Sequence, residues 1–212
     1  MATPFLGWTP GQLSGVAFGL SVAAGALAAL VRWTTPLLFL AVAVLVFTSG
    51  VFDALDGEVA RRTHRASRRG DFLDHVLDRY ADVAIVLGIA ASGYVDPIVA
   101  LLALVGLLLV SYLGTQGQAL GVGRIYAGLL GRADRMLVLT LAAFLEFDLS
   151  LPWPWAPTAP LSRIQYGGIS FTVLDVAMVY FVVAGQLTAV LRARWLYRKL
   201  TAAGDAAPPA IP

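Results

Sequence analysis

Four aspartates recur at helical spacing within a strongly apolar chain. Asp53 and Asp56 lie near the end of one apolar segment, and Asp74 and Asp78 lie near the start of the next. Separations of three and four residues place each pair on one face of a helix. Ionised side chains at membrane depth are costly, so they normally face a protein interior and serve a function. Because a short arginine-rich connection joins the two segments, we expect the four carboxylates to converge on one point.

Convergent carboxylates repel one another unless a cation lies between them. Ligand sets made only of oxygen suit Mg2+, Mn2+ or Ca2+. We therefore predict a divalent-metal site at a membrane surface, with Asp53, Asp56, Asp74 and Asp78 as candidate ligands. The expected metal is Mg2+ or Mn2+. Two such ions, about 4 Å apart, can stabilise both the attacking and the leaving oxygen of an in-line displacement.

The composition of the chain predicts an integral membrane protein. Of its 212 residues, 58% are hydrophobic and only 13% are charged, whereas a soluble domain usually carries about 25% charged residues. The absence of cysteine excludes disulfides and thiol catalysis. The formal net charge of +2 says little by itself, and no nucleic-acid partner is expected.

Six apolar segments approach the roughly 20 residues that a helix needs to cross a bilayer. We predict an all-α fold of six transmembrane helices, at approximately 13–31, 35–59, 72–93, 97–119, 134–149 and 168–192. Four prolines between 152 and 160 prevent continuation of the fifth helix, so residues 150–167 are expected to form a loop. Residues 1–200 would form a single domain, and residues 201–212, rich in small residues and proline, would form a disordered tail.

Basic residues are distributed unequally between the two ends of the predicted helices. The connections after the first, third and fifth helices hold Arg32 and Arg163, whereas the arginine clusters within 61–69, 124–135 and 192–199 belong to the other side. Because basic residues favour the cytoplasmic side, both termini and the metal site are expected to face the cytoplasm from the plasma membrane. Gly15 and Gly19 have the spacing of close helix packing, and we favour packing within the chain over a dimer interface.

The spacing of the acidic residues also matches a known pattern, written D-x2-D-G-x2-A-R-x8-G-x3-D-x3-D. Its fixed positions are all filled, by Asp53, Asp56, Gly57, Ala60, Arg61, Gly70, Asp74 and Asp78. The chain therefore resembles the CDP-alcohol phosphotransferase family, membrane enzymes that join a CDP-linked lipid to an alcohol and release CMP. The pattern covers only about an eighth of the chain, but its many fixed residues make it highly specific.

This resemblance implies a role for each position of the pattern. Asp78 would act as the general base for the incoming hydroxyl, as a metal ligand, or as both. Direct attack and a covalent intermediate both remain open, because both use carboxylates. The resemblance also implies a homodimer. The CDP group would be contacted by Asp56, Gly57, Ala60, Arg61, Gly70 and Asp74, where small side chains let the nucleotide approach the backbone and the arginine binds phosphate.

A second group of charged residues concerns the acceptor alcohol. Arg132 and Arg135 are three residues apart, so they lie on one face at the start of the fifth predicted helix. Together with Arg192 and Arg124 they would form a pocket for an anionic group such as a phosphate. The stretch 111–135 is similar to archaeal members of the family that use inositol phosphate. The expected substrates are a CDP-lipid, either CDP-archaeol or CDP-diacylglycerol, and inositol phosphate.

Alternative functions differ in the acceptor or in the class of protein. Glycerol phosphate, serine and free inositol are alternative acceptors for the same chemistry. A divalent-cation transporter is the alternative outside the enzyme class. Transporter sites usually lie near the bilayer midplane on broken helices, whereas this acidic group adjoins a connection with five arginines, which favours the enzyme. Among the other charged residues, Asp82 is expected to pair with Arg79, and His75 to be a spectator.

Overall fold

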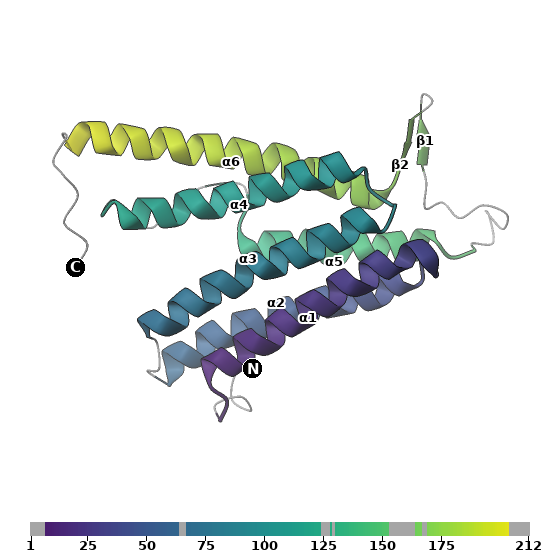
Figure 1. Ribbon diagram of the computed structural model, residues 1–212, viewed down its shortest axis with the longest axis horizontal. Helices are drawn as coiled ribbons and strands as arrows, with labels where there is room; N and C mark the ends of the chain where they lie inside the picture. Colours follow the sequence, from purple (N-terminus) through teal and green to yellow (C-terminus); the bar gives the residue numbers. More distant parts are fainter. Residues whose placement is uncertain are drawn as a thin grey trace.

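Six long helices dominate the computed structural model, which describes residues 7–63, 67–123, 128, 130–152, 164–166 and 169–203 (Figure 1). A single turn of 3-10 helix, Val31–Trp33, follows the first helix. The six predicted helices are therefore all present. Their bounds are α1 Pro10–Leu30, α2 Leu38–Arg62, α3 Arg68–Ala91, α4 Pro97–Ala119, α5 Arg132–Leu149 and α6 Val173–Ala203.

Within the described part of the chain, four stretches are helical, long and apolar enough to cross a membrane. They are Pro10–Trp33, Leu38–Arg62, Pro97–Ala119 and Val173–Ala202. The third and fifth helices are not among them, because charged residues are too frequent along both. Length and composition thus support a multi-pass membrane protein, and they support four of the six predicted spans.

The region before α6 differs from the prediction. Strands β1 (Ile164–Tyr166) and β2 (Ile169–Phe171) pair in antiparallel fashion, with Ile164 opposite Phe171. The helical class is confirmed in the main, but the predicted loop contains a strand at 164–166 and the last helix starts later than the predicted residue 168, since β-branched and aromatic residues favour strands. Residues 153–163, 167 and 168 lie outside the described residues. The last helix also continues to Ala203, so the predicted tail begins too early. Residues 204–212 of that tail lie outside the described residues.

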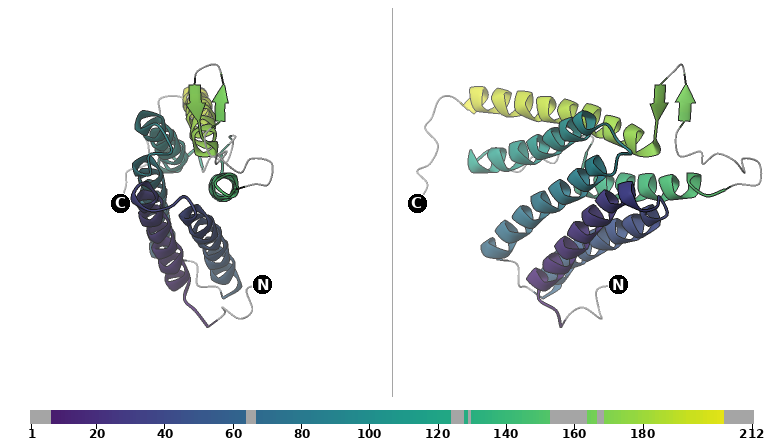
Figure 2. Two further views of the ribbon diagram at one scale, coloured as in Figure 1. Left: turned by 90° about the vertical axis from the view of Figure 1, so that its right-hand side faces the viewer. Right: turned by 45° about the vertical axis from the view of Figure 1, so that its right-hand side comes forward.

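The helices form two groups, which are connected by α5 and by a direct contact between α3 and α4. One group consists of α1 packed against α2 and α3, and the other consists of α4 packed along α6 (Figure 2). α5 contacts both α2 and α6, and α3 contacts α4. The largest fully buried side chains include Phe39, Ile85, Leu107 and Phe181, one from each of α2, α3, α4 and α6. Aromatic and aliphatic packing therefore joins the two groups around one core.

Glycine permits a close crossing between α1 and α3, in the group formed by α1, α2 and α3. A Cβ atom on Gly25 or on Gly88 would overlap the backbone of the facing helix, so α1 and α3 touch through their main chains. Gly15 and Gly19, by contrast, face open space. The expectation that this pair packs within the chain is therefore wrong, because α1 crosses α3 nearer to its C-terminal end.

The order of the helices gathers the charged segments at one end. The start of α1, the end of α2 and the start of α3 lie on the same side of the molecule as the ends of α4 and α6, and the hairpin lies on the opposite side (Figure 1). The α2–α3 connection therefore brings the two halves of the aspartate pattern together.

Candidate active site

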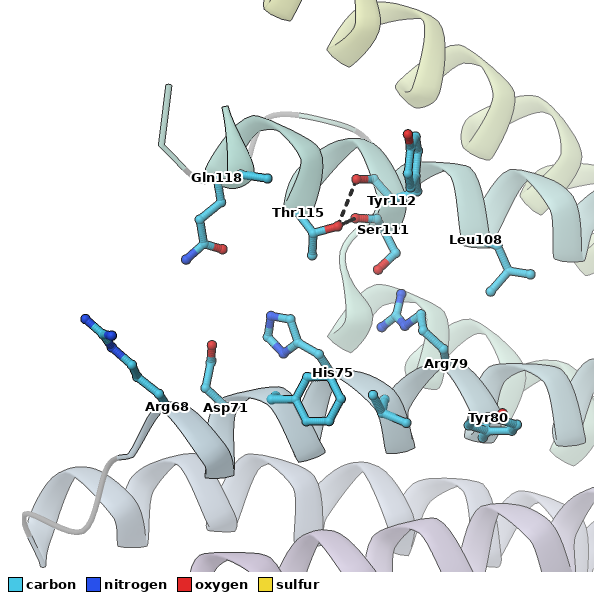
Figure 3. Close-up of a pocket in the computed structure, with 13 residues that line it drawn as sticks. Arg68, Asp71, His75, Arg79, Tyr80, Leu108, Ser111, Tyr112, Thr115 and Gln118 are labelled. Carbon is cyan, nitrogen blue, oxygen red and sulfur yellow. Dashed lines mark hydrogen bonds between the residues drawn. The ribbon is translucent and has the colours of Figure 1, made fainter. Parts of the chain in front are cut away.

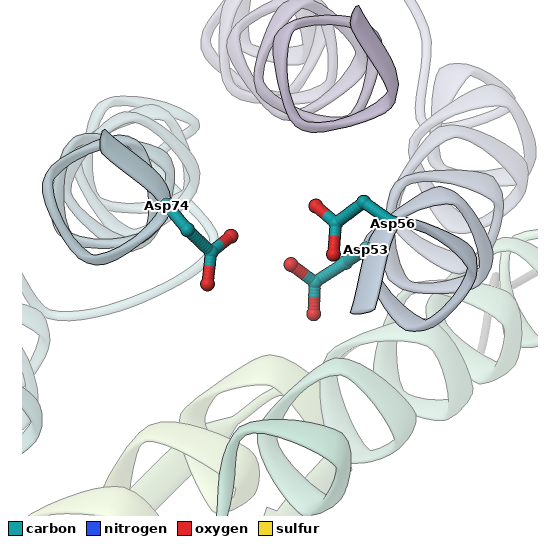
Figure 4. A group of neighbouring side chains, drawn as sticks. All are labelled: Asp53, Asp56 and Asp74. Carbon is teal, nitrogen blue, oxygen red and sulfur yellow. The ribbon is translucent and has the colours of Figure 1, made fainter. Parts of the chain in front are cut away.

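Three of the four predicted aspartates converge. Asp53 and Asp56 come from α2 and Asp74 from α3, and one carboxylate oxygen of each lies within 4.8 Å of the others (Figure 4). Asp56 is buried, and Oδ1 of Asp74 is a buried atom without a hydrogen-bond partner. The group therefore retains acceptor capacity that a cation would satisfy. Its oxygen ligands fit Mg2+ or Mn2+.

The start of α3 sets the position of Asp74. Ser67 caps the helix, and its side-chain oxygen accepts a hydrogen bond from the backbone N–H of Gly70 at 3.1 Å. A Cβ atom on Gly70 would lie only 3.2 Å from that oxygen. The cap itself therefore favours glycine at this position, independently of any ligand.

Ser14 on α1 belongs to the aspartate group, although the sequence analysis did not identify it. Its hydroxyl donates to Oδ2 of Asp56 at 2.7 Å and lies 3.1 Å from the carbonyl oxygen of Pro10. Ser14 and Ser21 are spaced two turns apart within a helix that is apolar beyond its first turn. That spacing was the available signal that one face of α1 meets polar groups.

Asp78 lies beside the three aspartates rather than among them. It is buried, its Oδ1 pairs with Arg132, and its Oδ2 lies 3.5 Å from a guanidinium nitrogen of Arg79. Arg132 also contacts Asp53, with 3.0 Å between Nη2 and Oδ1. Arg132 therefore links the aspartate group to Asp78, which lies outside the three converging carboxylates.

A buried ion pair lies one turn further along α3. Nη1 of Arg135 pairs with Oδ2 of Asp82, and both residues are buried. Arg79 lies 3.6 Å from the same carboxylate, which confirms the predicted Arg79–Asp82 pair. The closer partner, Arg135, comes from a distant segment of the chain, so local spacing did not reveal it.

A cavity of about 380 Å³ connects the aspartates with the predicted acceptor arginines. Nη1 of Arg192 donates to the carbonyl oxygen of Val110 at 2.6 Å. The structure thus places three of the four predicted arginines at one cavity, and Arg124 lies outside the described residues. The charged residues that line the cavity are Asp53, Asp71, Asp74, His75, Asp78, Arg79, Arg132, Arg135 and Arg192.

A neighbouring cavity of about 690 Å³ lies between α3 and α4. Asp71, His75 and Arg79 extend from α3 toward the facing side chains of Ser111 and Thr115 on α4 (Figure 3). These five residues line both cavities. Both ring nitrogens of His75 are buried without a hydrogen-bond partner. His75, which was expected to be a spectator, therefore lies in the wall shared by the two cavities.

A third cavity, of about 160 Å³, lies among α1, α2 and α3. Arg61 does not line it, because its guanidinium pairs with Glu58 at 2.8 Å on the exposed surface. A Cβ atom on Gly57 would make only an ordinary contact of 3.4 Å with Arg61, so packing does not require glycine there. The other five residues predicted to contact CDP all line this cavity, namely Asp56, Gly57, Ala60, Gly70 and Asp74.

Known proteins of similar sequence include archaetidylinositol phosphate synthases and phosphatidylinositol phosphate synthases. The sequence model described as CDP-alcohol phosphatidyltransferase matches residues 10–184. The archaetidylinositol phosphate synthase of Methanothermobacter thermautotrophicus is 33% identical over 158 residues, which are 74% of this chain and 70% of the relative. The phosphatidylinositol phosphate synthase of Streptomyces avermitilis is 32% identical over 170 residues, which are 77% of this chain and 64% of the relative.

Solved structures of similar fold include the phosphatidylinositol phosphate synthase of Mycobacterium tuberculosis. Its crystal structure in complex with manganese and citrate has a TM-score of 0.71 and 25% sequence identity, covering 93% of this chain and 89% of that chain. The crystal structure of the same enzyme with CDP-DAG bound has a TM-score of 0.69 at 24% identity, covering 93% of this chain and 94% of that chain. The second comparison establishes likeness of fold.

Proposed function

We propose that this chain, which belongs to the CDP-alcohol phosphatidyltransferase family, transfers a phosphatidyl-type group from a CDP-lipid to inositol phosphate and releases CMP. The family assignment confirms the resemblance seen in the aspartate pattern and identifies the chain as a phosphotransferase. The transporter alternative is therefore set aside. The observation that carries the proposal is the cavity in which the aspartates face Arg132, Arg135 and Arg192.

The CDP-lipid donor would bind where the three aspartates lie next to two further cavities. The small cavity lined by Gly57, Ala60 and Gly70 would hold the cytidine portion. A groove of about 250 Å³ between α2 and α5, lined by Phe47, Met136 and other apolar residues, leads to Asp53 and would take the lipid chains. CDP-archaeol and CDP-diacylglycerol share the diphosphate that would lie between these two cavities.

Asp53, Asp56 and Asp74 would hold Mg2+ or Mn2+, and two ions are proposed. A divalent cation bound there supplies charge neutralisation of the diphosphate, which otherwise repels a nucleophile. Manganese in the related mycobacterial crystal structure supports this choice of metal. The aspartates would orient the diphosphate by fixing the position of the bound cation. Asp56 is buried and Asp53 and Asp74 are partly buried, which would limit the access of water that weakens the interaction.

The acceptor would bind in the cavity next to Asp78. Arg132, Arg135 and Arg192 would bind its phosphate, and hydroxyl groups of the alcohol would face Ser111 and Thr115. Asp78 would take the proton from the attacking hydroxyl of the acceptor. The hydroxyl oxygen would form a bond to the phosphorus that carries the lipid, and CMP would leave with the electrons of the broken P–O bond. The base role requires Arg132 to move from Asp78 to the acceptor phosphate. A homodimer with this cavity open to the cytoplasm completes the proposal.

Acceptor preference of the purified enzyme tests the proposal directly. CMP release would be measured with inositol phosphate, glycerol phosphate, serine and free inositol, using a fixed CDP-lipid. Inositol phosphate is expected to give the highest kcat/KM. A charged hydrogen bond contributes ~1.5–3 kcal/mol, so Arg192→Ala should raise the KM for inositol phosphate about ten- to a hundredfold. The KM for CDP-lipid should stay nearly unchanged.

The matched control is Arg194→Ala, because Arg194 lies two residues away on α6 but is exposed and outside the cavity. It should alter neither KM by more than about threefold, which separates a cavity effect from a general loss of basic charge. A wild-type enzyme that prefers free inositol would contradict the proposal. An Arg192→Ala enzyme that loses inositol and inositol phosphate equally would also contradict it.

A further inference from the structure

We propose that Ser14 is a positioning residue that holds the carboxylate of Asp56 in the orientation needed to bind the divalent cation. The inference rests on the proposed function, in which Asp53, Asp56 and Asp74 are the metal ligands. It adds a residue of α1, outside the aspartate pattern, to the machinery of the site.

The geometry that carries the proposal is a buried hydrogen bond between helices. Oγ of Ser14 lies 2.7 Å from Oδ2 of Asp56, and the two residues are 8% and 7% exposed. Ser14 also borders the small cavity that contains Asp56 and Asp74. Hydrogen bonds to an ionised acceptor are roughly twice as strong as neutral ones, and exclusion of water strengthens them further. The bond therefore fixes the rotation of the Asp56 carboxylate.

This fixed rotation matters because the neighbours of Asp56 carry the same charge. Asp53 and Asp74 place oxygens within 4.8 Å of an Asp56 oxygen, and terminal carboxylate torsions have broad energy wells. Without a fixed donor, repulsion would turn Asp56 away from the other two. Donors that orient metal ligands in this way typically change metal affinity ten- to a hundredfold when they are removed.

A simpler role for the bond would be to fasten α1 to α2. The same helix pair contains a second buried hydroxyl contact that serves as a comparison. Oγ of Ser21 lies 2.7 Å from Oγ of Ser49, and Ser49 donates to the carbonyl oxygen of Ala17 at 2.8 Å. Ser21 and Ser49 are each seven residues from Ser14 and Asp56 respectively and are fully buried. Removing Ser21 therefore tests helix packing without touching a carboxylate.

Manganese binding to metal-stripped protein in detergent, followed by electron paramagnetic resonance, tests the proposal without substrates or turnover. Ser14→Thr and Ser14→Val have nearly the same shape, and only the first keeps a hydroxyl. Ser14→Thr should bind Mn2+ within about threefold of wild type, whereas Ser14→Val should raise the Kd about ten- to a hundredfold. Ser21→Ala should lower the thermal midpoint and leave the Kd for Mn2+ unchanged.

Equal Mn2+ affinity of the folded Ser14→Thr and Ser14→Val proteins would overturn the proposal. A loss of affinity in Ser21→Ala as large as that in Ser14→Val would also overturn it, since helix packing would then explain the effect. If the larger side chains prevent folding, Ser14→Ala replaces them and must show the same raised Kd. A wild-type protein that binds no Mn2+ would instead refute the metal site of the proposed function, and this inference with it.

Discussion

Buried acids occur at both ends of this helix bundle, but they have different partners. At the hairpin end, Glu146 is fully buried and its Oε2 accepts hydrogen bonds from the backbone N–H groups of Val173 and Leu174 at 3.0 and 3.4 Å. At the opposite end, Asp53, Asp56 and Asp74 face one another. Free N–H groups at a helix start favour an anion, whereas facing carboxylates destabilise the fold. An acid paired with backbone N–H groups therefore stabilises the fold, whereas acids that face one another indicate a functional site.

Asp175 extends this comparison. This residue lies in the first turn of α6. Its carboxylate accepts hydrogen bonds from the backbone N–H groups of Thr172 at 3.0 Å and Asp96 at 3.2 Å. It therefore joins the start of α6 to the start of α4. Like Glu146, it completes backbone hydrogen bonding at the hairpin end.

Metal removal should have the largest effect, and only at the aspartate end. Excess EDTA should reduce CMP release to background, because the carboxylates alone cannot neutralise the diphosphate, and Mg2+ or Mn2+ should restore it. The thermal midpoint should fall by less than it does in a hairpin-end variant. Undiminished turnover by metal-stripped enzyme would remove the functional distinction between the two ends.

Replacement of Asp78 should have the next largest effect. Asp78→Asn keeps the shape of the side chain but cannot accept the hydroxyl proton, so kcat should fall by at least ~10²-fold. Binding of CDP-lipid, measured separately by titration, should weaken much less. Asp175→Asn, the same substitution at the hairpin end, is the control and should retain near-normal kcat. Near-normal turnover by Asp78→Asn would require a different base.

The smallest effect on turnover is expected at Glu146. Glu146→Ala removes the acceptor for two buried N–H groups, which should lower the free energy of unfolding by about 2 kcal/mol. Thermal denaturation in detergent would measure this change. The kcat of the protein that remains folded should match that of wild type. Glu146→Gln, which keeps an oxygen acceptor, should destabilise the protein less. A loss of kcat in either variant would contradict a purely structural role for Glu146.

Local spacing predicted the features that depend on a single helix. The positions of all six helices followed from runs of apolar residues, and the i, i+3 pair of Arg79 and Asp82 followed from helical periodicity. The convergence of Asp53, Asp56 and Asp74 followed because one short connection separates their helices. The hairpin before α6 was missed, since its three-residue strands are too short to give a periodic signal.

The sequence by itself determined that this is a membrane protein with an acidic centre, because composition and short-range spacing are local properties of the chain. The enzyme class followed from the resemblance of the aspartate pattern to a known family. Only the tertiary structure decided which distant residues complete that centre. Ser14 meets Asp56, and Arg135 meets Asp82, because helices from different parts of the chain cross at fixed positions. The contact between Gly25 and Gly88 sets one further crossing, that of α1 with α3. The geometry of these crossings depends on how whole helices pack, which no short segment specifies.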